Sequence, residues 1–131
     1  LACDLMVVAD EATLADTHAK FGLRPTWGMS QRLPAAVGLT MARELSLTAR
    51  NIKGVEAASI GLACRSAPGD QLDAEVAGLV EQILGNSDGS LAAYKDLYRV
   101  AEQDGLTDGL AYEAATDYPI TDTDSRLDGF R

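Results

Sequence analysis

His18 is the residue of this chain best suited to move a proton, and it is the sole histidine in the sequence. A histidine side chain titrates near neutral pH, so it can serve as an acid or as a base under physiological conditions. Asp16 and Thr17 precede it and could orient the ring. Two other interpretations stay open, because a lone histidine is usually a structural hydrogen-bonding residue and a nearby Asp usually caps a turn.

Other familiar catalytic patterns are missing from the sequence. It contains no G-x-S-x-G, P-loop, G-x-G-x-x-G or H-E-x-x-H motif. Ser30, Ser59 and Ser66 have no triad partner that the sequence reveals. The spacing of the carboxylates is typical of solvated helix faces.

Cys3 and Cys64 are the two cysteines of the chain. Two thiols so far apart are usually small buried hydrophobic residues, so we expect neither a disulfide nor a catalytic thiol. One histidine and two cysteines also lack the ligand spacing of a zinc site, and no metal is expected.

The net charge of −9 argues against nucleic acid as a partner, because nucleic-acid binding requires Lys and Arg to neutralise phosphates. Lys20, Arg24 and Arg32 form the one locally basic stretch, and such a stretch is usually solvated surface. No apolar run approaches the ~20 residues of a membrane span. Since no signal-peptide pattern is visible either, a cytoplasmic protein without a membrane partner is expected.

The chain is long enough for one small domain with a core, but it begins without Met and directly inside expected structure. We therefore expect a fragment of a longer protein. Short strands are predicted at residues 5–9, where an apolar run suits a strand buried on both faces, and at 62–64. Residues 17–21 are predicted to form a short strand or extended loop, followed by a turn-rich loop at 22–28.

Helices dominate the rest of the predicted structure. They are expected at residues 28–37 with Ser30 as a possible cap, at 39–48, at 55–60, and from 70 or 71 to 84. Two further helices are expected around a break at Gly105, and a last one begins near Thr121. This order predicts an α/β first part and a helical tail. Because so few strands cannot form a stable sheet alone, their partners are expected outside the chain.

Four segments, in order and at matching intervals, carry a resemblance to a known family. The chain has LACDL at residues 1–5, AKFGLRPTWG at 19–28 followed by SQRLP at 30–34, AREL and LTAR between 42 and 50, and AA-x-IGL at 57–62. Together they resemble the second half of an enoyl-CoA hydratase/isomerase (crotonase) family protein. Ala49 stands where that family usually has Gly.

The resemblance implies a fold and a ligand class. The fold is the C-terminal part of a crotonase-like ββα superhelix at residues 1–65, forming one wall of an acyl-CoA site, followed by a helical oligomerisation region at 66–131. Members self-associate as trimers, often as dimers of trimers. They bind acyl-CoA thioesters, hold the thioester oxygen as the enolate develops, and move protons with one or two carboxylates.

The same resemblance implies roles for individual residues. His18 stands where the family has its second catalytic glutamate, and the first glutamate and the oxyanion-hole residues fall upstream of Leu1. Trp27 is expected either to line the acyl pocket or to be a buried anchor of its loop. Gly28 is expected to allow close backbone approach at a helix start. Phe130 resembles an aromatic residue that covers CoA, although helix packing is the other interpretation.

Two functions from different classes are consistent with these features. One is an enzyme that hydrates an enoyl-CoA or shifts its double bond in fatty-acid metabolism, with no cofactor beyond the coenzyme A of its substrate. The other is a non-catalytic crotonase-like subunit or acyl-CoA-binding module. The glutamate replaced by His18 favours the second function, and the preserved loop at residues 22–34 favours the first.

Overall fold

The structure is a computed structural model that describes residues 1–129. By contacts the chain divides into two compact units, Leu1–Ala77 and Gly78–Arg131. The predicted division after residue 65 stays a prediction. The strands are β1 (Val7–Ala9), β2 (Thr13–Leu14), β3 (Ile52–Lys53) and β4 (Arg65–Ala67). The helices are α1 (Met29–Val37), α2 (Leu39–Thr48), α3 (Gly54–Ser59), α4 (Leu72–Leu84), α5 (Asp88–Ala115) and α6 (Thr123–Asp128), with 3₁₀ turns η1 (Ala19–Phe21) and η2 (Gly69–Gln71).

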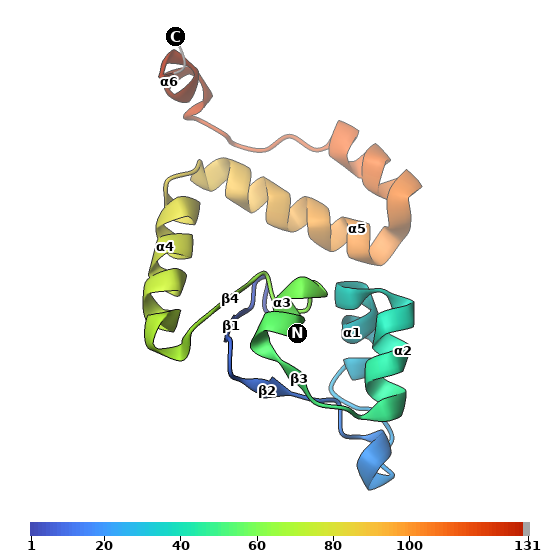
Figure 1. The fold of residues 1–131 in the computed structure, drawn as a ribbon. Coiled ribbons are helices and arrows are strands. Elements are labelled where there is room, and N and C mark those ends of the chain that lie inside the picture. The colour runs from blue at the N-terminus through green and yellow to red at the C-terminus, as the bar shows by residue number, and fades with distance from the viewer. Residues whose placement is uncertain (130–131) are drawn as a thin grey trace. The chain divides into compact units, whose positions relative to one another are not determined.

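Two strand pairs organise the first unit (Figure 1). β1 pairs in parallel with β4, and β2 pairs antiparallel with β3. The observed strand β1 is shorter than the predicted range of 5–9. Its residues are half-buried, and not buried on both faces, because a two-stranded sheet leaves them partly uncovered. The strand predicted at 62–64 is wrong. The backbone N–H groups of Leu62 and Ala63 both donate to the Ala57 carbonyl at 2.9 and 3.0 Å, so these residues close α3 and the strand begins after them.

Helices α1 and α2 confirm their predictions closely. The bounds of α2 match the predicted range of 39–48, and α1 begins one residue later than expected. The cap at the start of α1 is Gly28 with no side-chain hydrogen bond, so the expectation of Ser30 as cap is wrong. The apolar stripes of the two helices supply the centre of the core, which comprises Leu33, Ala42, Leu45, Ile52, Ala57 and Ala63.

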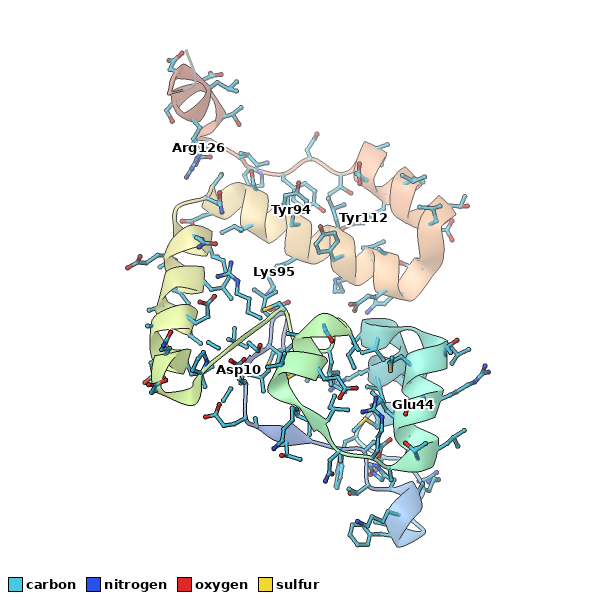
Figure 2. All side chains as sticks on the ribbon, viewed as in Figure 1. Asp10, Glu44, Tyr94, Lys95, Tyr112 and Arg126 are labelled. Carbon is cyan, nitrogen blue, oxygen red and sulfur yellow. The ribbon has the colours of Figure 1, made fainter. Side chains whose placement is uncertain are left out.

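Arg50 joins α2 to α3 just beyond the end of α2. Its Nε donates to Glu44 (labelled on α2 in Figure 2) at 2.7 Å, and its terminal nitrogen donates to Glu56 on α3 at 2.6 Å. The hydrogen bond from Arg50 lowers the pKa of Glu56. Since all three side chains remain about a third or more exposed, this network fixes geometry more than it adds stability.

Ala49 ends α2 in a left-handed conformation, with φ 50° and ψ 30°. That conformation costs a residue with a Cβ roughly 1–2 kcal/mol in the folded state, whereas it costs Gly almost nothing. Gly in turn loses more conformational entropy when the chain folds. We therefore expect Ala49→Gly to raise the free energy of unfolding by about 0.5–1 kcal/mol. Ala35→Gly, at an exposed position inside α1, is the matched control and should lower it by a similar amount. Urea denaturation of both variants measures whether the free energy of unfolding rises in Ala49→Gly and falls in Ala35→Gly. A lower free energy of unfolding for Ala49→Gly than for the wild type would contradict the expectation.

The second unit confirms the predicted helical tail and its break. Gly105 has non-helical φ/ψ (76°, 178°), and Figure 1 shows α5 turning back there. Asp96, before the turn, accepts hydrogen bonds from Tyr112 (labelled in Figure 2) at 2.8 Å and from Tyr118 at 2.9 Å. Loss of hydration, together with the bond to Asp96, raises the pKa of Tyr118 to about 12. This cluster ties the two arms of α5 together. None of the helices in residues 1–129 is long and apolar enough to cross a membrane.

Candidate functional site

Asp16 and His18 form a close side-chain pair. Oδ1 of Asp16 lies 2.6 Å from Nδ1 of His18, and the side chains are 5% and 12% exposed. The same oxygen also accepts the backbone N–H of His18 at 3.2 Å. The pair therefore occupies a sheltered position in which the carboxylate contacts both the backbone and the ring of the histidine.

Ser46 completes the hydrogen bonding of this carboxylate. Its hydroxyl donates to Oδ2 of Asp16 at 2.7 Å, from α2 and across 30 residues of sequence. Burial acts to raise the pKa of Asp16, but the hydrogen bonds from His18 and Ser46 outweigh it, and the pKa ends below its ordinary value. Asp16 is therefore ionised at neutral pH. An ionised carboxylate only accepts hydrogen bonds, so Nδ1 of His18 must carry a proton.

The pair is held by local turn chemistry. The hydrogen bond from the His18 backbone to the Asp16 side chain is an Asx-type turn, and the 3₁₀ turn η1 follows it directly. Phe21 then donates to the carbonyls of Thr17 and His18, both at 3.2 Å. The prediction of a short strand or extended loop at 17–21 is thus wrong, because Asp16 starts a turn and a 3₁₀ turn follows it. The loop at 22–28 is as predicted.

Trp27 lies against His18 at the end of that loop. The ring centroids are 5.9 Å apart and tilted by 56°, and Trp27 is 87% exposed. It is not a buried anchor within this chain. Trp27 and Gly28 both have positive φ, 54° and 77°, and Met29 donates to the Thr26 carbonyl at 3.0 Å, as in a type I′ turn. Gly28 suits this turn, whereas Trp27 is held in a conformation that costs about 1–3 kcal/mol.

Gly28 is left-handed, and its φ of 77° is what favours glycine at the start of α1. A Cβ there would lie 3.2 Å from the side chain of Arg32, which is exposed and can shift. Phe130, the fourth predicted site residue, lies outside the described residues. The structure thus brings His18 and Trp27 together and places Gly28 next to Trp27.

An apolar hollow of about 200 Å³ adjoins Asp16. Asp16 contributes to its wall, while His18 and Trp27 are not among its lining residues. The remaining lining is mostly aliphatic and comes from Leu1, Met6, Leu14, Ala15, Met29, Leu33, Leu45, Arg50, Ile52 and Leu62. Beside such an apolar wall, each hydrogen bond that Asp16 accepts is electrostatically stronger than it would be in water.

The cysteines differ from expectation. Cys3 and Cys64 are both exposed and free, as opposed to buried. Cys64 lies one residue before the start of β4. Its sulfur lies 3.1 Å from the Met6 carbonyl oxygen. Among residues 1–129, no group of three or more His, Cys, Asp or Glu is arranged to hold a metal ion.

Sequence comparison identifies the family of this chain. The model of the enoyl-CoA hydratase/isomerase family matches residues 1–131, the whole sequence. The chain belongs to the enoyl-CoA hydratase/isomerase family. A putative enoyl-CoA hydratase of Thermus thermophilus is 34% identical over 100% of this chain and 51% of its own length. A probable enoyl-CoA hydratase of Mycobacterium tuberculosis is 32% identical over 97% of this chain and 49% of its own length.

Solved structures of the enoyl-CoA hydratase/isomerase family share its fold. An enoyl-CoA hydratase from Bacillus anthracis has a TM-score of 0.81 at 31% identity, covering 86% of this chain and 44% of that one. A putative enoyl-CoA hydratase from Thermobifida fusca, solved with acetoacetyl-CoA, has a TM-score of 0.77 at 34% identity, covering 97% and 48%. The chain has the crotonase fold of the C-terminal half, as predicted, and spans about half the length of the curated relatives it matches.

The lowered pKa of Asp16 makes stability depend on acid pH. A carboxyl whose pKa is lower in the folded than in the unfolded state stabilises the fold above its ordinary value of 3.8, and the contribution is lost as pH falls through the folded value. We expect the free energy of unfolding to fall between about pH 5 and pH 3, and to fall less in Asp16→Asn. Urea denaturation at both pH values measures the difference, with exposed Asp70→Asn as control. An equal loss of unfolding free energy between pH 5 and pH 3 in the wild type and in Asp16→Asn would contradict this account.

Proposed function

We propose that the intact protein acts on an enoyl-CoA thioester and adds water across its double bond, with His18 as a proton-transfer group. The observation that carries the proposal is the sheltered Asp16–His18 pair, at the position where the family resemblance implies a catalytic acid. Hydration adds the proton and the hydroxide of water without net oxidation or reduction, so the reaction as proposed uses no redox cofactor. The coenzyme A belongs to the substrate.

The tautomer of His18 determines which nitrogen reacts. Because Nδ1 donates to the ionised Asp16, Nε2 of a neutral His18 has a lone pair available for a proton. In the forward direction Nε2 takes a proton from water while the water oxygen bonds to the β carbon. As that bond forms, the π electrons of the double bond move to the thioester as an enolate, and the protonated Nε2 then gives its proton to the α carbon, which returns His18 to its neutral form. Stabilisation of that enolate falls to residues upstream of this chain, as the resemblance implies.

The relatives support a CoA thioester as substrate and hydration as the reaction. Several of the similar proteins are named enoyl-CoA hydratases, and another is a methylglutaconyl-CoA hydratase of mouse, 31% identical over 98% of this chain and 42% of its length. The Thermobifida fusca structure contains acetoacetyl-CoA. These ligands and reactions belong to those proteins, and they are carried to this chain as part of the proposal.

Trp27 and Gly28 are proposed to contact the acyl group. The indole of Trp27 is exposed and lies beside the His18 ring, so an acyl chain placed against it would be close to the proton-transfer group. The turn that Gly28 permits sets the backbone from which the indole projects. Phe130 stays a proposed CoA contact on the resemblance alone.

Self-association as a trimer, or as a dimer of trimers, is also proposed from the resemblance. Tyr94, Tyr98, Leu106 and Leu110 of α5 are each more than half exposed, and a second copy could cover such apolar surface. Light scattering of the intact protein measures the assembly.

The test of the proposed function is turnover of crotonyl-CoA by the intact protein, followed as loss of the conjugated enoyl thioester. We expect turnover with formation of a 3-hydroxyacyl-CoA. A product with a shifted double bond, obtained from a longer enoyl-CoA, would assign isomerisation instead. Binding of acyl-CoA without any turnover would overturn the enzyme proposal and support the non-catalytic subunit.

A further inference from the structure

Ser46 is a polar residue on the inward side of a helix, and its hydroxyl has a specific partner. It follows the buried Leu45 and lies one helical turn from the buried Ala42. From there its Oγ donates to Oδ2 of Asp16 at 2.7 Å. Both residues belong to the first unit, within residues 1–77.

The two oxygens of Asp16 have separate tasks. Oδ1 accepts from the ring and the backbone of His18, while Oδ2 accepts from Ser46. A carboxylate is planar, so a donor that fixes Oδ2 also fixes the direction in which Oδ1 points. Without Ser46 the carboxylate is free to rotate about its Cβ–Cγ bond, and it would also lose one of the hydrogen bonds that keep it ionised.

The ring of His18 has no other hydrogen-bonding partner among residues 1–129. Nδ1 is held by Asp16, and Nε2 has no bond to the described residues. Trp27 contacts one side of the ring but supplies no hydrogen bond to it. The orientation and tautomer of the imidazole therefore depend on Asp16, and the orientation of Asp16 depends in turn on α2.

We propose that Ser46 is a positioning residue of the active site, which acts through Asp16 to hold His18 with Nδ1 protonated and Nε2 free to exchange a proton with substrate. This inference rests on the proposed function of His18 and extends it to a residue in another element. It makes α2, which contributes to the core, a part of the catalytic apparatus.

The experiment compares Ser46→Ala, Ser46→Thr and Thr48→Ala in the intact protein. Thr48 is two residues further along α2, and its hydroxyl donates to the backbone of its own helix at Glu44. We expect Ser46→Ala to lower kcat for crotonyl-CoA by roughly 10-fold with little change in KM, since one hydrogen bond to a charged group is lost. Ser46→Thr, which keeps the hydroxyl, should restore most of the rate, and Thr48→Ala should leave it unchanged.

Two further measurements separate positioning from a structural effect. In Ser46→Ala, the acid limb of the profile of kcat/KM against pH should shift from its wild-type position, because this limb reports the base that takes a proton from water, and the carboxylate in contact with that base has lost a hydrogen bond. Nitrogen-15 NMR of the His18 ring, identified by its absence in His18→Gln, should show a protonated Nδ1 in the wild type and a mixture of tautomers in Ser46→Ala.

The outcomes distinguish this inference from the function beneath it. If the wild type turns over substrate through His18 but Ser46→Ala keeps its rate, pH profile and tautomer, the positioning role is overturned and the function stands. If the wild type shows no turnover, the function fails, and the NMR result still decides whether Ser46 sets the tautomer. A wild-type ring protonated at Nε2 and not at Nδ1 would overturn the inference by itself.

Discussion

Replacing Gly54 with alanine is expected to destabilise the protein more than any other small substitution in this chain. Gly54 begins α3 and is buried, and a Cβ on it would lie 1.9 Å from the carbonyl oxygen of Ala9 and 2.8 Å from the carbonyl carbon. Those atoms belong to the backbone of β1, so no side chain can rotate out of the way. Accommodating the methyl group requires β1 and α3 to separate.

That separation would break several contacts at once. The backbone N–H of Gly54 donates to the carbonyls of Asp10 and Ala12, each at 3.1 Å, and β1 is paired with β4 along its length. Overpacking of a core costs typically 1–3 kcal/mol, and a clash with fixed backbone belongs at the upper end, so we expect about 3 kcal/mol or more. Thermal and urea denaturation of the intact protein measure the loss.

Gly78→Ala is the matched control for this substitution. Gly78 lies inside α4, and a Cβ there would meet nothing within 4 Å. Alanine favours a helix interior by roughly 0.5–1 kcal/mol over glycine, so this variant should be slightly more stable than the wild type. A Gly54→Ala protein with wild-type stability would contradict the close approach of α3 to β1.

Replacing His18 with alanine is expected to have the largest effect on activity. General acid–base catalysis by a positioned side chain contributes about 10²–10⁴-fold to a rate, and His18→Ala should lower kcat by a factor in that range. His18→Gln is the more informative variant, because an amide can still donate to Asp16 but cannot exchange a proton at neutral pH. We expect both variants to be equally impaired in kcat and to retain acyl-CoA binding.

Lys20→Ala controls for changes to the surrounding loop. Lys20 is exposed in η1, two residues from His18, and takes no part in the proposed chemistry. The Lys20→Ala variant should therefore have the kcat of the wild type. A His18→Gln enzyme that keeps wild-type kcat would remove His18 from the mechanism. A His18→Gln protein that fails to fold would mark the role of His18 as structural.

The helices of this fold were predictable because their signals are local and repeated. The range of α2 followed from its apolar periodicity and the glycine before it, and the break in α5 followed from Gly105. The strands were not predictable in the same way. β2 and β3 are two residues long, too short to show any alternation, and β4 begins three residues later than expected because the Ala57 carbonyl captures the preceding N–H groups.

The candidate site was predictable only in part. His18 was found from its chemistry and from its place in the family pattern, and Asp16 was suggested by its proximity in sequence. Ser46 was missed because it is 30 residues from Asp16. A signal for it did exist, since a half-buried serine beside the buried Leu45 favours a hydrogen-bonding partner within the protein. What the sequence could not supply was the identity of that partner.

Incorporation of deuterium from solvent tests most directly the central claim, that His18 transfers a proton from water to a CoA thioester. The intact protein is incubated with crotonyl-CoA in deuterium oxide, and the product is analysed by mass spectrometry. We expect the wild type to form a 3-hydroxyacyl-CoA that carries one deuterium at the α carbon, and His18→Gln to form little or none. Equal incorporation by the two proteins, or none by either, would contradict the account.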